Sequence, residues 1–578
     1  MDKPWVKLYQ GFPEDIAIPD ATMYELLSAA ATQWPDQTAC FYMGKRLTFA
    51  QLKAEIDQCA AAFSANGVKA HDTVVLSLPN VPNAIVCFYA LNKIGARAAM
   101  THPLSSADEL QHYIDITEAR WVVTLDMFYP VFHELASKTS LEHLVIAHFS
   151  DYLTPPMKIG FAVTKGRKIA AVPPGDPLVI AWKDFLATGT AGKDPAPAYT
   201  RPIEPDDGCV VLFSGGTTSL PKGIELSSVN FNALAVAIKA IAHVEMGDSV
   251  LAILPIFHGF GLGLCIHTIL CAGAYPILVP EFSAANYIDN LIKHHPSYIA
   301  GVPTLFQALL GNPKFTKVRF DKLKGAFSGG DLLSADLKKR FDSVIMAQGS
   351  RVELMEGYGL TECVTGCVLS PAHAYRDNSM GIPVPDMLVK VADSATGDQL
   401  PYGTEGEICV TGPTLMKGYV KDPEATAATL REHADGRVWL HTGDIGTMDS
   451  DGYLYFMGRI KRIVKVSGMS VYPMQVEQVL EAHPLVNRAC VIGLPDDYQM
   501  SSLKAFVLLA DGTTGNDEVR SELIAYCKQH LIKWAVPRQI EFRTELPTTR
   551  VGKIAYTDLE REELAKLKDA AASASPAV

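Results

Sequence analysis

Two hydrophobic periodicities alternate along the first part of the chain. Residues 23–32, 48–57 and 83–94 carry apolar side chains with the spacing of an amphipathic helix. Residues 73–79 and 121–125 are short runs rich in Val, Leu and Thr, which are typical of buried strands. Because helical and strand patterns follow one another, the sequence predicts layered α/β sheets.

The same alternation returns between residues 209 and 350. Strands are expected at Ser249–Leu254 and Tyr298–Val302, where short apolar runs are bounded by polar residues. Helices are expected at Ala285–His294 and Ser334–Phe341. The two stretches of alternation together predict a large α/β region.

From residue 380 the pattern changes to short strands with Gly and Asp turns, which indicates a β-rich subdomain. These strands are expected at Leu388–Val391, Gly406–Val410 and Tyr453–Phe456. After Gly458 the chain forms a compact α+β segment. Its expected elements are helices at Met474–His483 and Asp517–His530 and strands at Ala489–Ile492 and Leu503–Leu509.

The predicted fold is therefore α/β, with a large N-terminal domain of layered α/β sheets plus the β-rich subdomain, followed by a small C-terminal α+β domain. We place the domains at residues 1–458 and 459–578. A chain of 578 residues exceeds the usual size of a single core, which agrees with this division. The Ala- and Ser-rich residues 570–578 are expected to be disordered.

Gly259–Val279 carries no formal charge and is long enough to cross a bilayer. Glycines, His267 and Pro276 interrupt the segment, and Ala272-Gly-Ala divides it in two. We expect a buried helix followed by a buried strand, and a membrane span is the alternative.

Residues 150–206 differ from the flanking regions. Prolines are frequent, and Lys158, Lys165, Arg167 and Lys168 lie close to apolar residues. A surface excursion between two parts of the main fold is the simpler interpretation. Contact with anionic lipid is the alternative, because basic residues beside apolar ones suit a negatively charged membrane surface.

Composition and charge narrow the functional classes. The net charge of −12 argues against a nucleic-acid-binding protein. The 11 cysteines are scattered without a Cys-x-x-Cys pair, which favours reduced thiols in a cytoplasmic protein over disulfides or a zinc site. The first residues lack the apolar core of a signal peptide.

The stretch from Cys209 to Gly223 holds the first chemical motif. An apolar run ends in Ser214-Gly-Gly-Thr-Thr-Ser-Leu-Pro-Lys222, in which glycines, hydroxyls and a lysine ammonium can surround a phosphate. A Walker A loop is excluded, because Pro221 precedes the lysine and Gly223 follows it. The alternative is a mobile surface turn.

Four further stretches carry polar groups in glycine-containing loops. Glu356-Gly-Tyr-Gly-Leu-Thr-Glu362 offers an aromatic face and a carboxylate suited to Mg²⁺, and Trp439-Leu-His-Thr-Gly-Asp444 offers a carboxylate after an expected tight turn. Gly458–Gly468 places four cations at the expected domain boundary, and Pro547–Lys553 presents a lysine. Each alone is compatible with an ordinary turn, linker or solvated lysine.

In this order, the five motifs resemble those of the adenylate-forming superfamily, which includes acyl-CoA synthetases, luciferases and peptide-synthetase adenylation domains. The similarity extends from about residue 20 to about residue 560. The chain is most similar to bacterial medium- and long-chain fatty acyl-CoA synthetases. This closer similarity is carried by Pro4-Trp-Val-Lys-Leu-Tyr, Gly301-Val-Pro-Thr-Leu-Phe, Leu354-Met-Glu-Gly-Tyr-Gly-Leu-Thr-Glu-Cys and Val466-Ser-Gly-Met-Ser-Val-Tyr-Pro.

The resemblance implies two half-reactions. ATP converts a carboxylate to an acyl-adenylate with release of pyrophosphate, and the CoA thiol then displaces AMP. The nucleotide would contact Ser214, Gly215, Gly216, Thr217, Thr218, Lys222, Gly357, Tyr358, Asp444 and Arg459. Catalytic roles would fall to Lys553, Thr361, Glu362 and His258, with Glu362 holding Mg²⁺. The acyl pocket would be bordered by His258, Gly301, Gly329 and Gly330.

The resemblance also implies a mobile C-terminal domain. Lys461 matches the hinge position about which that domain would rotate between the half-reactions. Rotation would withdraw Lys553 and bring Lys465, Ser467 and Gly468 to the CoA passage.

The sequence departs from the family pattern at four positions, which are Ser219, Ser228, Arg462 and Tyr556. These departures put the details of hinge motion and rate in doubt, and they leave the reaction class unchanged.

The expected substrates are therefore a medium- or long-chain fatty acid, ATP and CoA, handled with Mg²⁺ by a cytoplasmic monomer or homodimer, with peripheral contact at the inner face of the membrane as an alternative. Three other functions are weighed. The acceptor could be the phosphopantetheine of a carrier protein, the acid could be an aryl or steroid acid, or the chain could be a silent nucleotide- or acyl-binding homologue. Retention of Lys222, Glu362, Asp444, Arg459 and Lys553 argues against the silent homologue.

Overall fold

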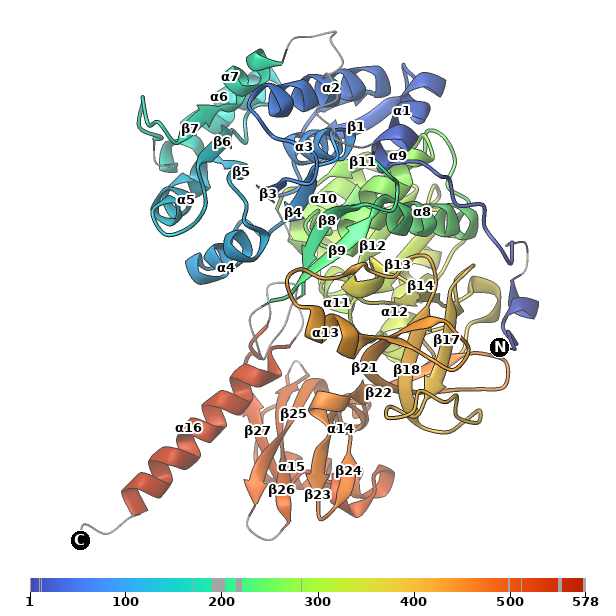
Figure 1. Ribbon diagram of the computed structural model, residues 1–578. Coiled ribbons are helices and arrows are strands. Elements are labelled where there is room, and N and C mark those ends of the chain that lie inside the picture. The colour runs from blue at the N-terminus through green and yellow to red at the C-terminus, as the bar shows by residue number, and fades with distance from the viewer. Residues whose placement is uncertain are drawn as a thin grey trace.

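The computed structural model describes residues 2–9, 11, 13–169, 171–189, 203–214, 221–281, 283–496, 499–510, 512–548 and 554–574. Figure 1 shows a large lobe that runs from the N-terminus to β22 (Leu454–Arg459), and a smaller lobe below it that holds the remaining elements. The division at residues 458 and 459 stays a prediction, although β22 carries Arg459 into a sheet of the large lobe.

Sheet A of the large lobe has nine strands in the order β16-β15-β14-β13-β12-β10-β11-β1-β2. Their bounds are β16 (Ile382–Pro383), β15 (Val368–Leu369), β14 (Leu354–Tyr358), β13 (Gly325–Gly329), β12 (Tyr298–Gly301), β10 (Ser249–Ala252), β11 (Tyr275–Leu278), β1 (Thr38–Tyr42) and β2 (Lys45–Thr48). The strands from β14 to β1 are parallel, and the outer strands are antiparallel.

Sheet B has eight strands in the order β19-β9-β8-β4-β3-β5-β6-β7. Their bounds are β19 (Gly418–Tyr419), β9 (Gly223–Ser227), β8 (Gly208–Phe213), β4 (Arg97–Met100), β3 (Thr73–Ser77), β5 (Trp121–Leu125), β6 (His143–Ala147) and β7 (Val179–Ala181). The six strands from β8 to β7 are parallel.

Alternate residues of the central strands enter different cores, because successive side chains of a strand point to opposite faces. Val74 and Leu76 belong to the core between sheets A and B, which we call the inner core. Val75 between them belongs to the core on the opposite face of sheet B, which we call the outer core of that sheet. In β10, Leu251 likewise faces the outer core of sheet A. The result is a five-layer arrangement in which helices lie between the two sheets and on both outer faces.

The inner layer holds α1 (Met23–Gln33), α2 (Phe49–Ala65), α3 (Pro82–Lys93), α8 (Ser228–Ala242) and α9 (Ile269–Cys271). Sheet A is covered outside by α10 (Ala284–His294), α11 (Pro303–Leu310) and α12 (Ala335–Ala347). Sheet B is covered outside by α4 (Ala107–Thr117) and α5 (Tyr129–Ala136), while α6 (Pro155–Val163) and α7 (Trp182–Thr188) flank β6 and β7.

The expected β-rich subdomain is a five-stranded sheet, which we call sheet C. It contains β17 (Leu388–Ala392), β18 (Gly406–Thr411), β20 (Leu430–Glu432), β21 (Val438–Met448) and β22, with α13 (Pro423–Thr429) beside it. The small lobe contains the hairpin of β23 (Val464–Val466) and β24 (Met469–Val471), and a sheet of β25 (Val486–Asp496), β26 (Met500–Leu509) and β27 (Gln539–Arg543). Its helices are α14 (Pro473–Glu481), α15 (Asp517–His530) and α16 (Tyr556–Ala574).

The uncharged segment Gly259–Val279 is buried, as predicted. It begins with a π-helix (Phe260–Thr268), continues as α9 and ends in β11. A π-turn at this point is a local distortion of the kind often found at functional sites. Within the described residues, no helix combines the length and apolarity that a membrane span requires.

The tail prediction needs a correction. Residues 570–574, expected to be disordered, continue α16 to Ala574, because alanine has the highest intrinsic helix propensity and extends a helix that is already nucleated. Residues 575–578 lie outside the described part of the chain. The first part of α16 packs on the small lobe through Leu559 and Glu563, and Figure 1 shows the C-terminal part of the helix projecting beyond the lobe.

The N-terminal segment is fixed to sheet C before the chain reaches α1. Trp5 is only 1% exposed, and a Cβ added at Gly452 would lie 2.9 Å from its Cβ. Lys7 pairs with Asp451 (2.6 Å), and the Tyr9 hydroxyl donates to the carbonyl of Pro383 (2.6 Å). The first residues therefore tie the subdomain to the main sheets.

A buried acid joins the ends of β13 and β14. The Leu333 amide donates to Oε1 of Glu356 (2.9 Å), which fixes the loop that follows β13. Burial raises the pKa of Glu356 to about 8. The carboxyl group is therefore protonated in the folded protein at neutral pH.

We predict that Trp5→Ala lowers the free energy of unfolding by roughly 3–5 kcal/mol, the usual cost of truncating a buried Trp. Denaturant unfolding would measure the loss. Met346→Ala, at a side chain that is 39% exposed, is the control and should leave stability nearly unchanged. Equal stability of the two variants would contradict the anchoring role of Trp5.

We predict that Glu356→Gln becomes increasingly stable relative to the wild type as the pH rises from 5 to 8. An unfolded Glu ionises near pH ~4.3, whereas folded Glu356 keeps its proton up to about pH 8. The folded state then binds more protons in this window, so wild-type stability falls as the pH rises. Thermal unfolding at each pH measures the difference, and a constant difference would contradict the raised pKa.

Candidate active site

The carboxyl ends of the parallel strands in sheets A and B open onto one cleft of about 2930 Å³. Sheet A contributes loop residues that include Pro255, Glu281, Val302, Gly330 and Thr361, and sheet B contributes Pro79, His102, Met127, Phe149 and Ser214. The small lobe closes another side with residues that include Lys461, Glu477 and Thr548. Ligands of open α/β sheets bind outside the carboxyl ends of the strands, so this cleft is the candidate active site.

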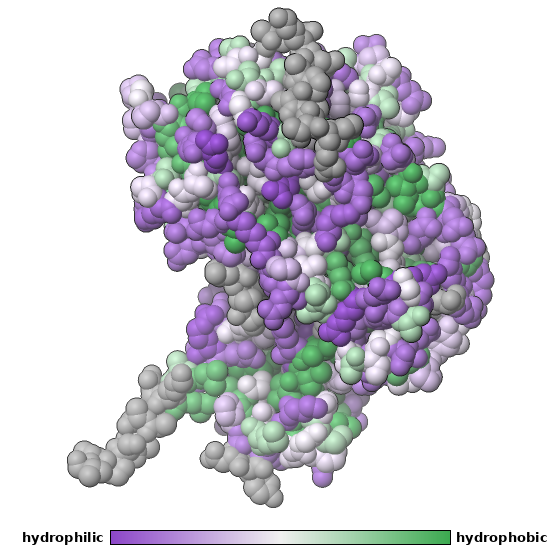
Figure 2. Space-filling model, viewed as in Figure 1, coloured by the Kyte–Doolittle hydropathy of each residue, from purple (hydrophilic) through white to green (hydrophobic). Residues whose placement is uncertain are grey.

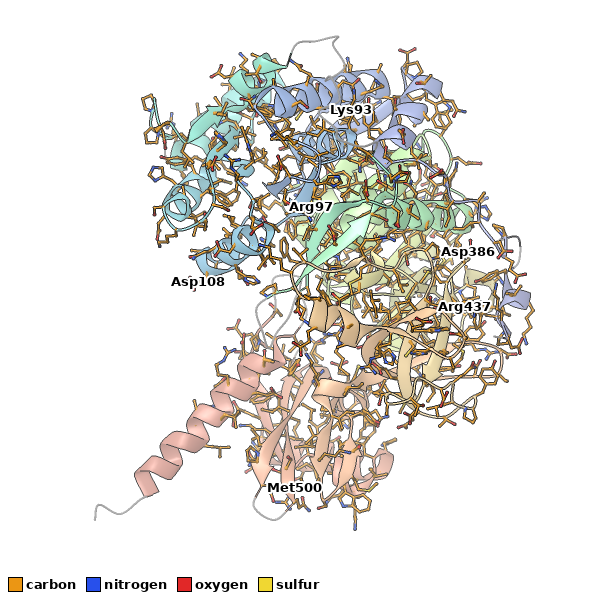
Figure 3. The ribbon with its side chains drawn as sticks, in the orientation of Figure 1. Lys93, Arg97, Asp108, Asp386, Arg437 and Met500 are labelled. Carbon is orange, nitrogen blue, oxygen red and sulfur yellow. The ribbon has the colours of Figure 1, made fainter. Side chains whose placement is uncertain are left out.

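The predicted phosphate loop is closed at its base. The Ser214 amide donates to the carbonyl of Lys222 (3.0 Å), and the Lys222 amide donates to Oγ of Ser214 (3.0 Å). Arg97 of β4 pairs with Glu225 of β9 (3.0 Å), and Figure 3 labels Arg97 beside these strands. Gly215, Gly216, Thr217 and Thr218 lie outside the described residues, so their contact with phosphate stays a prediction.

Glu362, the predicted magnesium ligand, lies in the cleft wall beside a tyrosine. The Tyr419 hydroxyl donates to Oε1 of Glu362 (2.9 Å). Burial raises the pKa of Tyr419, and Glu362 raises it further, so this hydroxyl stays a donor. The Lys222 ammonium lies 4.5 Å from the centre of the Tyr419 ring and 3.8 Å from Oδ2 of Asp422. One tyrosine thus connects the carboxylate to the lysine of the phosphate loop.

Sequence analysis did not identify Tyr419. Its only local signal is the pair Gly418-Tyr419, which reaches the cleft because β19 adds to the edge of sheet B beside β9. That pairing joins residues far apart in the chain, so local pattern alone could not have placed this side chain.

A strained turn fixes the loop after Glu362. Val364 has φ 65° and ψ −60°, which is unfavourable for a β-branched residue, and the Thr365 amide donates to the carbonyl of Cys363 (2.7 Å). The Val364 carbonyl packs on Gly259, where an added Cβ would lie 1.6 Å from that oxygen. Only glycine fits at this contact, which holds the Glu362 loop against the start of the π-helix.

Asp444 is buried in the cleft and held by two partners. The Tyr358 hydroxyl donates to Oδ2 of Asp444 (2.8 Å), and Arg459 forms an ion pair with Oδ1 (3.1 Å). Burial raises the pKa of Tyr358, with Asp444 adding to the effect, so the hydroxyl remains the donor. The carboxylate therefore lies at the cleft wall between a tyrosine hydroxyl and a guanidinium.

The expected tight turn before Asp444 is wrong. Residues 438–448 form the single long strand β21, and the register with β18 shifts between Glu407 and Cys409. Gly443 takes φ 70° within this irregularity. The extra residues form a β-bulge, which bends the strand and turns Asp444 toward the cleft.

Two residues behind the bulge were not predicted. The Gly443 amide donates to Oε1 of Glu407 (3.0 Å). The other oxygen, Oε2, lies 2.7 Å from Nδ1 of His441. Glu407, Cys409 and His441 are close enough to hold a metal. Both Glu407 oxygens already have partners, however, so the group's evident role is to brace the bulge that carries Asp444.

His258 lines the cleft where the π-helix begins. The Phe260 amide donates to Nδ1 of His258 (3.2 Å), so the proton of the neutral ring lies on Nε2. Gly329 and Gly330, the expected borders of the acyl entrance, also line the cleft.

The assignment of Gly301 to the acyl pocket needs correction. This residue ends β12 and does not line the cleft, and an added Cβ would lie 2.7 Å from Leu305 Cδ2. Its small size serves the packing of α11 on sheet A. Val302, the next residue, lines the cleft instead.

The small lobe faces the cleft with residues that include Lys461, Arg462, Glu477 and Tyr556. Lys461, the predicted hinge, lies in the 3₁₀ turn Ile460–Arg462 and lines the cleft. The unusual residues Arg462 and Tyr556 contact each other, with the guanidinium 4.4 Å from the ring centre. Arg462 also pairs with Glu477 (2.7 Å).

Lys553 lies outside the described residues, but the ends of its loop are placed. Thr548 and Ile554 form a β-bridge and both line the cleft. The Ala555 amide donates to the carbonyl of Pro547 (2.8 Å), which closes the loop at its base. The loop therefore leaves from and returns to the edge of the cleft.

The residues predicted for the CoA passage lie elsewhere in this conformation. Lys465, Ser467 and Gly468 belong to the β23–β24 hairpin and are not among the cleft residues. The Ser467 amide donates to the carbonyl of Gln499 (2.8 Å), next to Met500, which Figure 3 labels at the far end of the small lobe. Their role after domain rotation stays a prediction.

Comparison with known proteins identifies the family of the chain. The family model of the AMP-binding enzyme matches residues 27–420, and that of the AMP-binding enzyme C-terminal domain matches residues 475–553. The long-chain-fatty-acid–CoA ligase of Bacillus subtilis is 32% identical over 580 residues, which cover 97% of this chain and 98% of that protein. The enzyme of the same description from Salmonella typhimurium is 31% identical and covers 99% of this chain and 100% of that protein.

A solved structure agrees on the fold. The crystal structure of the anthranilate CoA ligase AuaEII in complex with anthranoyl-AMP matches with a TM-score of 0.80 and 24% identity, covering 95% of this chain and 98% of that chain. The α/β fold with a smaller C-terminal domain is thus confirmed. By its family models, its full-length relatives and its fold, the chain belongs to the AMP-binding enzyme family of adenylate-forming enzymes.

Proposed function

We propose that this protein is an ATP-dependent fatty acyl-CoA ligase. It would join a fatty acid to ATP to give acyl-AMP and pyrophosphate, and then transfer the acyl group to the CoA thiol with release of AMP. The observation that carries the proposal is the single cleft in which Lys222, Glu362, Asp444 and Arg459 meet beside an apolar wall. The relatives described as long-chain-fatty-acid–CoA ligases support it along nearly the whole chain.

The first step brings a carboxylate to a triphosphate, so fixed cations must offset the accumulating negative charge. Lys222 and the loop of Ser214–Lys222 are suited to the terminal phosphates. Lys553, on the loop from the small lobe, would lie between the carboxylate and the α-phosphate. Thr361 would donate its hydroxyl to the same phosphate.

Glu362 fits a magnesium ligand. It is a half-buried carboxylate with one oxygen bonded to Tyr419, which leaves acceptor capacity on the group. Mg²⁺ in such sites takes one or two carboxylates and completes its shell with phosphates and water. When bound, the ion would neutralise phosphate charge, and Tyr419 would keep Glu362 oriented toward it.

Asp444 suits the ribose. An ionised carboxylate accepts hydrogen bonds from two neighbouring hydroxyls, and the β-bulge presents it at the cleft wall. Gly357 and Tyr358, on the adjoining strand β14, would border the adenine.

The acyl chain would lie against an apolar part of the cleft wall. This part of the wall is formed by side chains from α8, the π-helix, β13 and the segment before β16, namely Leu234, Ile238, Phe260, Leu264, Phe327 and Met380. Its apolar surface favours an aliphatic chain, since burying such a chain is driven by the hydrophobic effect. His258, with its proton on Nε2, would stand where acid and thiol meet.

A direct assay tests the proposal. Pyrophosphate release would be measured with carboxylic acids from acetate to palmitate, and with aryl and bile acids, first alone and then with CoA or a holo-carrier protein. We expect turnover with fatty acids and thioester formation with CoA. Turnover only with the carrier protein, only with aryl or bile acids, or with no acid would overturn it.

We predict that Lys553→Ala lowers acyl-AMP formation by at least ~10²-fold, because it removes charge stabilisation made in the transition state. Thioester formation from supplied acyl-AMP should change far less. Separate single-turnover assays would measure the two steps, with Lys528→Ala on α15 as the control for loss of one lysine. An equal loss in both steps would contradict the role assigned to Lys553.

We predict that Tyr419→Phe lowers kcat/KM for pyrophosphate release about tenfold and raises the Mg²⁺ concentration needed for half-maximal rate. A hydrogen bond to a charged group contributes about 1.5–3 kcal/mol, and the variant removes one from Glu362. Tyr402→Phe, at an exposed tyrosine, is the matched control. An unchanged magnesium dependence would rule out this role for Tyr419.

A further inference from the structure

Three side chains connect the turn before β21 to the bulge that carries Asp444. The Gly443 amide in the bulge donates to Glu407, and Nδ1 of His441 lies 2.7 Å from the other carboxylate oxygen. On the opposite side of its ring, Nε2 of His441 lies 2.9 Å from Nε2 of His433. We call Glu407, His441 and His433 the histidine chain. It links the cleft wall to His433, which does not line the cleft.

The ring of His433 is held in a fixed place. It stacks on the buried Trp439 ring, with centroids 5.8 Å apart. A Cβ added at Gly397 would lie 2.7 Å from Cε1 of His433, and Gly397 has φ 75°, so both the space and the backbone require glycine there. Residues 434–437 of the same turn are exposed, and Figure 2 shows hydrophilic surface (purple) on the side of the large lobe where Figure 3 labels Arg437. The turn therefore faces water, while the ring packs inward.

The contacts of the histidine chain fix the order of its protons. A carboxylate oxygen accepts, so Nδ1 of His441 donates to Glu407. Nε2 of the neutral His441 ring then accepts, and Nε2 of His433 donates to it. Within the described residues, Nδ1 of His433 is buried and has no hydrogen-bond partner. An unprotonated nitrogen fits this position.

The histidine chain has no good place for an additional proton. On His433 the proton would make Nδ1–H a buried donor without an acceptor. On Nε2 of His441 it would face the N–H of His433, which could accept it only by moving its own proton to Nδ1. Both cases leave the same buried N–H unpaired, at a cost comparable to a lost hydrogen bond.

The surrounding charges act in the same direction. Burial lowers the pKa of His433 below its usual value, and Lys390 of β17 and His441 lower it further. Arg431 of β20 also disfavours a cation, whereas Asp435 in the turn favours one. The ring of His433 is therefore neutral at neutral pH, and the histidine chain is intact.

We propose that His433 is a positioning residue for the nucleotide: through the histidine chain it fixes the bulge from which Asp444 meets the ribose. The inference rests on the proposed contact between Asp444 and the ribose hydroxyls. Protonation of His433 breaks the chain and releases the bulge. Because the ribose takes no part in bond making, the loss falls on nucleotide binding and leaves the chemical step nearly unchanged.

A bound metal ion is the competing explanation, because Cys409 lies close to Glu407 and His441. Two histidine nitrogens on one tetrahedral zinc ion lie about 3.3 Å apart, whereas 2.9 Å is the length of an N–H···N hydrogen bond. Burial also raises the pKa of the Cys409 thiol to about 12, and zinc requires a thiolate. The geometry therefore favours a shared proton over a metal.

The first experiment measures AMP binding to the full-length protein by isothermal titration calorimetry at pH 8. His433→Phe removes the donor and should raise the dissociation constant about tenfold. His433→Gln keeps an N–H at the position of Nε2 and should bind within about twofold of the wild type. His133→Gln, at an exposed histidine on α5, is the control and should leave the dissociation constant unchanged. Wild-type affinity in His433→Phe would overturn the proposal.

The second experiment repeats these titrations from pH 8 to pH 5. The unperturbed pKa of histidine is ~6.5, and that of His433 is lower, so the wild type should lose affinity as the pH falls below this value. Glutamine does not titrate. The ratio of the wild-type dissociation constant to that of His433→Gln should therefore rise from near one to several-fold, and the titration of the AMP phosphate cancels in it. A constant ratio would overturn the proposal, and thermal unfolding at each pH shows that both proteins are folded.

The third experiment asks whether the effect passes through the ribose. With 2′,3′-dideoxy-AMP, which lacks both hydroxyls, His433→Phe and the wild type should bind equally. An equal loss with both nucleotides would overturn the proposal, as would a stoichiometric transition metal found by elemental analysis of the purified protein. AMP binding needs neither acid nor CoA. AMP binding without ligase activity would therefore overturn the proposed function alone, and no AMP binding would overturn both.

Discussion

Carboxylates must be kept in a cleft that receives a polyanion, and the structure meets this constraint twice in the same way. Asp444 is bonded by the Tyr358 hydroxyl and lies beside Arg459. Glu362 accepts a hydrogen bond from the Tyr419 hydroxyl, and the ring of the same tyrosine lies beside the Lys222 ammonium. In both cases burial keeps the tyrosine protonated, so it remains a donor. Each carboxylate is thus oriented by a tyrosine hydroxyl and lies in the same cluster as a cationic side chain.

Each of the three sheets places different residues at the cleft. Sheets A and B direct the carboxyl ends of their parallel strands at the same cleft, which supplies the loops. Sheet C supplies Asp444 from the middle of a strand, and this requires the β-bulge that Glu407 and His441 brace. The N-terminal segment, through Trp5, holds sheet C to the rest of the lobe. Long-range packing therefore sets the position of Asp444.

The small lobe has a hydrophobic core of its own and contributes charged residues to the cleft. Its buried residues form clusters of their own, and Lys461 and the ends of the Lys553 loop reach the cleft edge. The β23–β24 hairpin lies at the other end of the lobe. The same core therefore supports both the edge that faces the cleft and the hairpin that does not. The contact between Arg462 and Tyr556 lies beside the expected hinge, so these two departures from the family pattern form one pair.

Hydrophobic patterns in the sequence indicated many of the helices and strands. In β3, for example, Val74, Val75 and Leu76 form a continuous apolar run because both faces of the strand are buried. The motifs rich in glycine and hydroxyl groups indicated a nucleotide site, because such groups can surround a phosphate. Tertiary structure alone decided that Tyr419 bonds Glu362, that a bulge carries Asp444 and that Gly301 packs against α11. These features depend on strand pairing and close approach between residues distant in the chain, and a local pattern carries no information about which distant residue fills the neighbouring space.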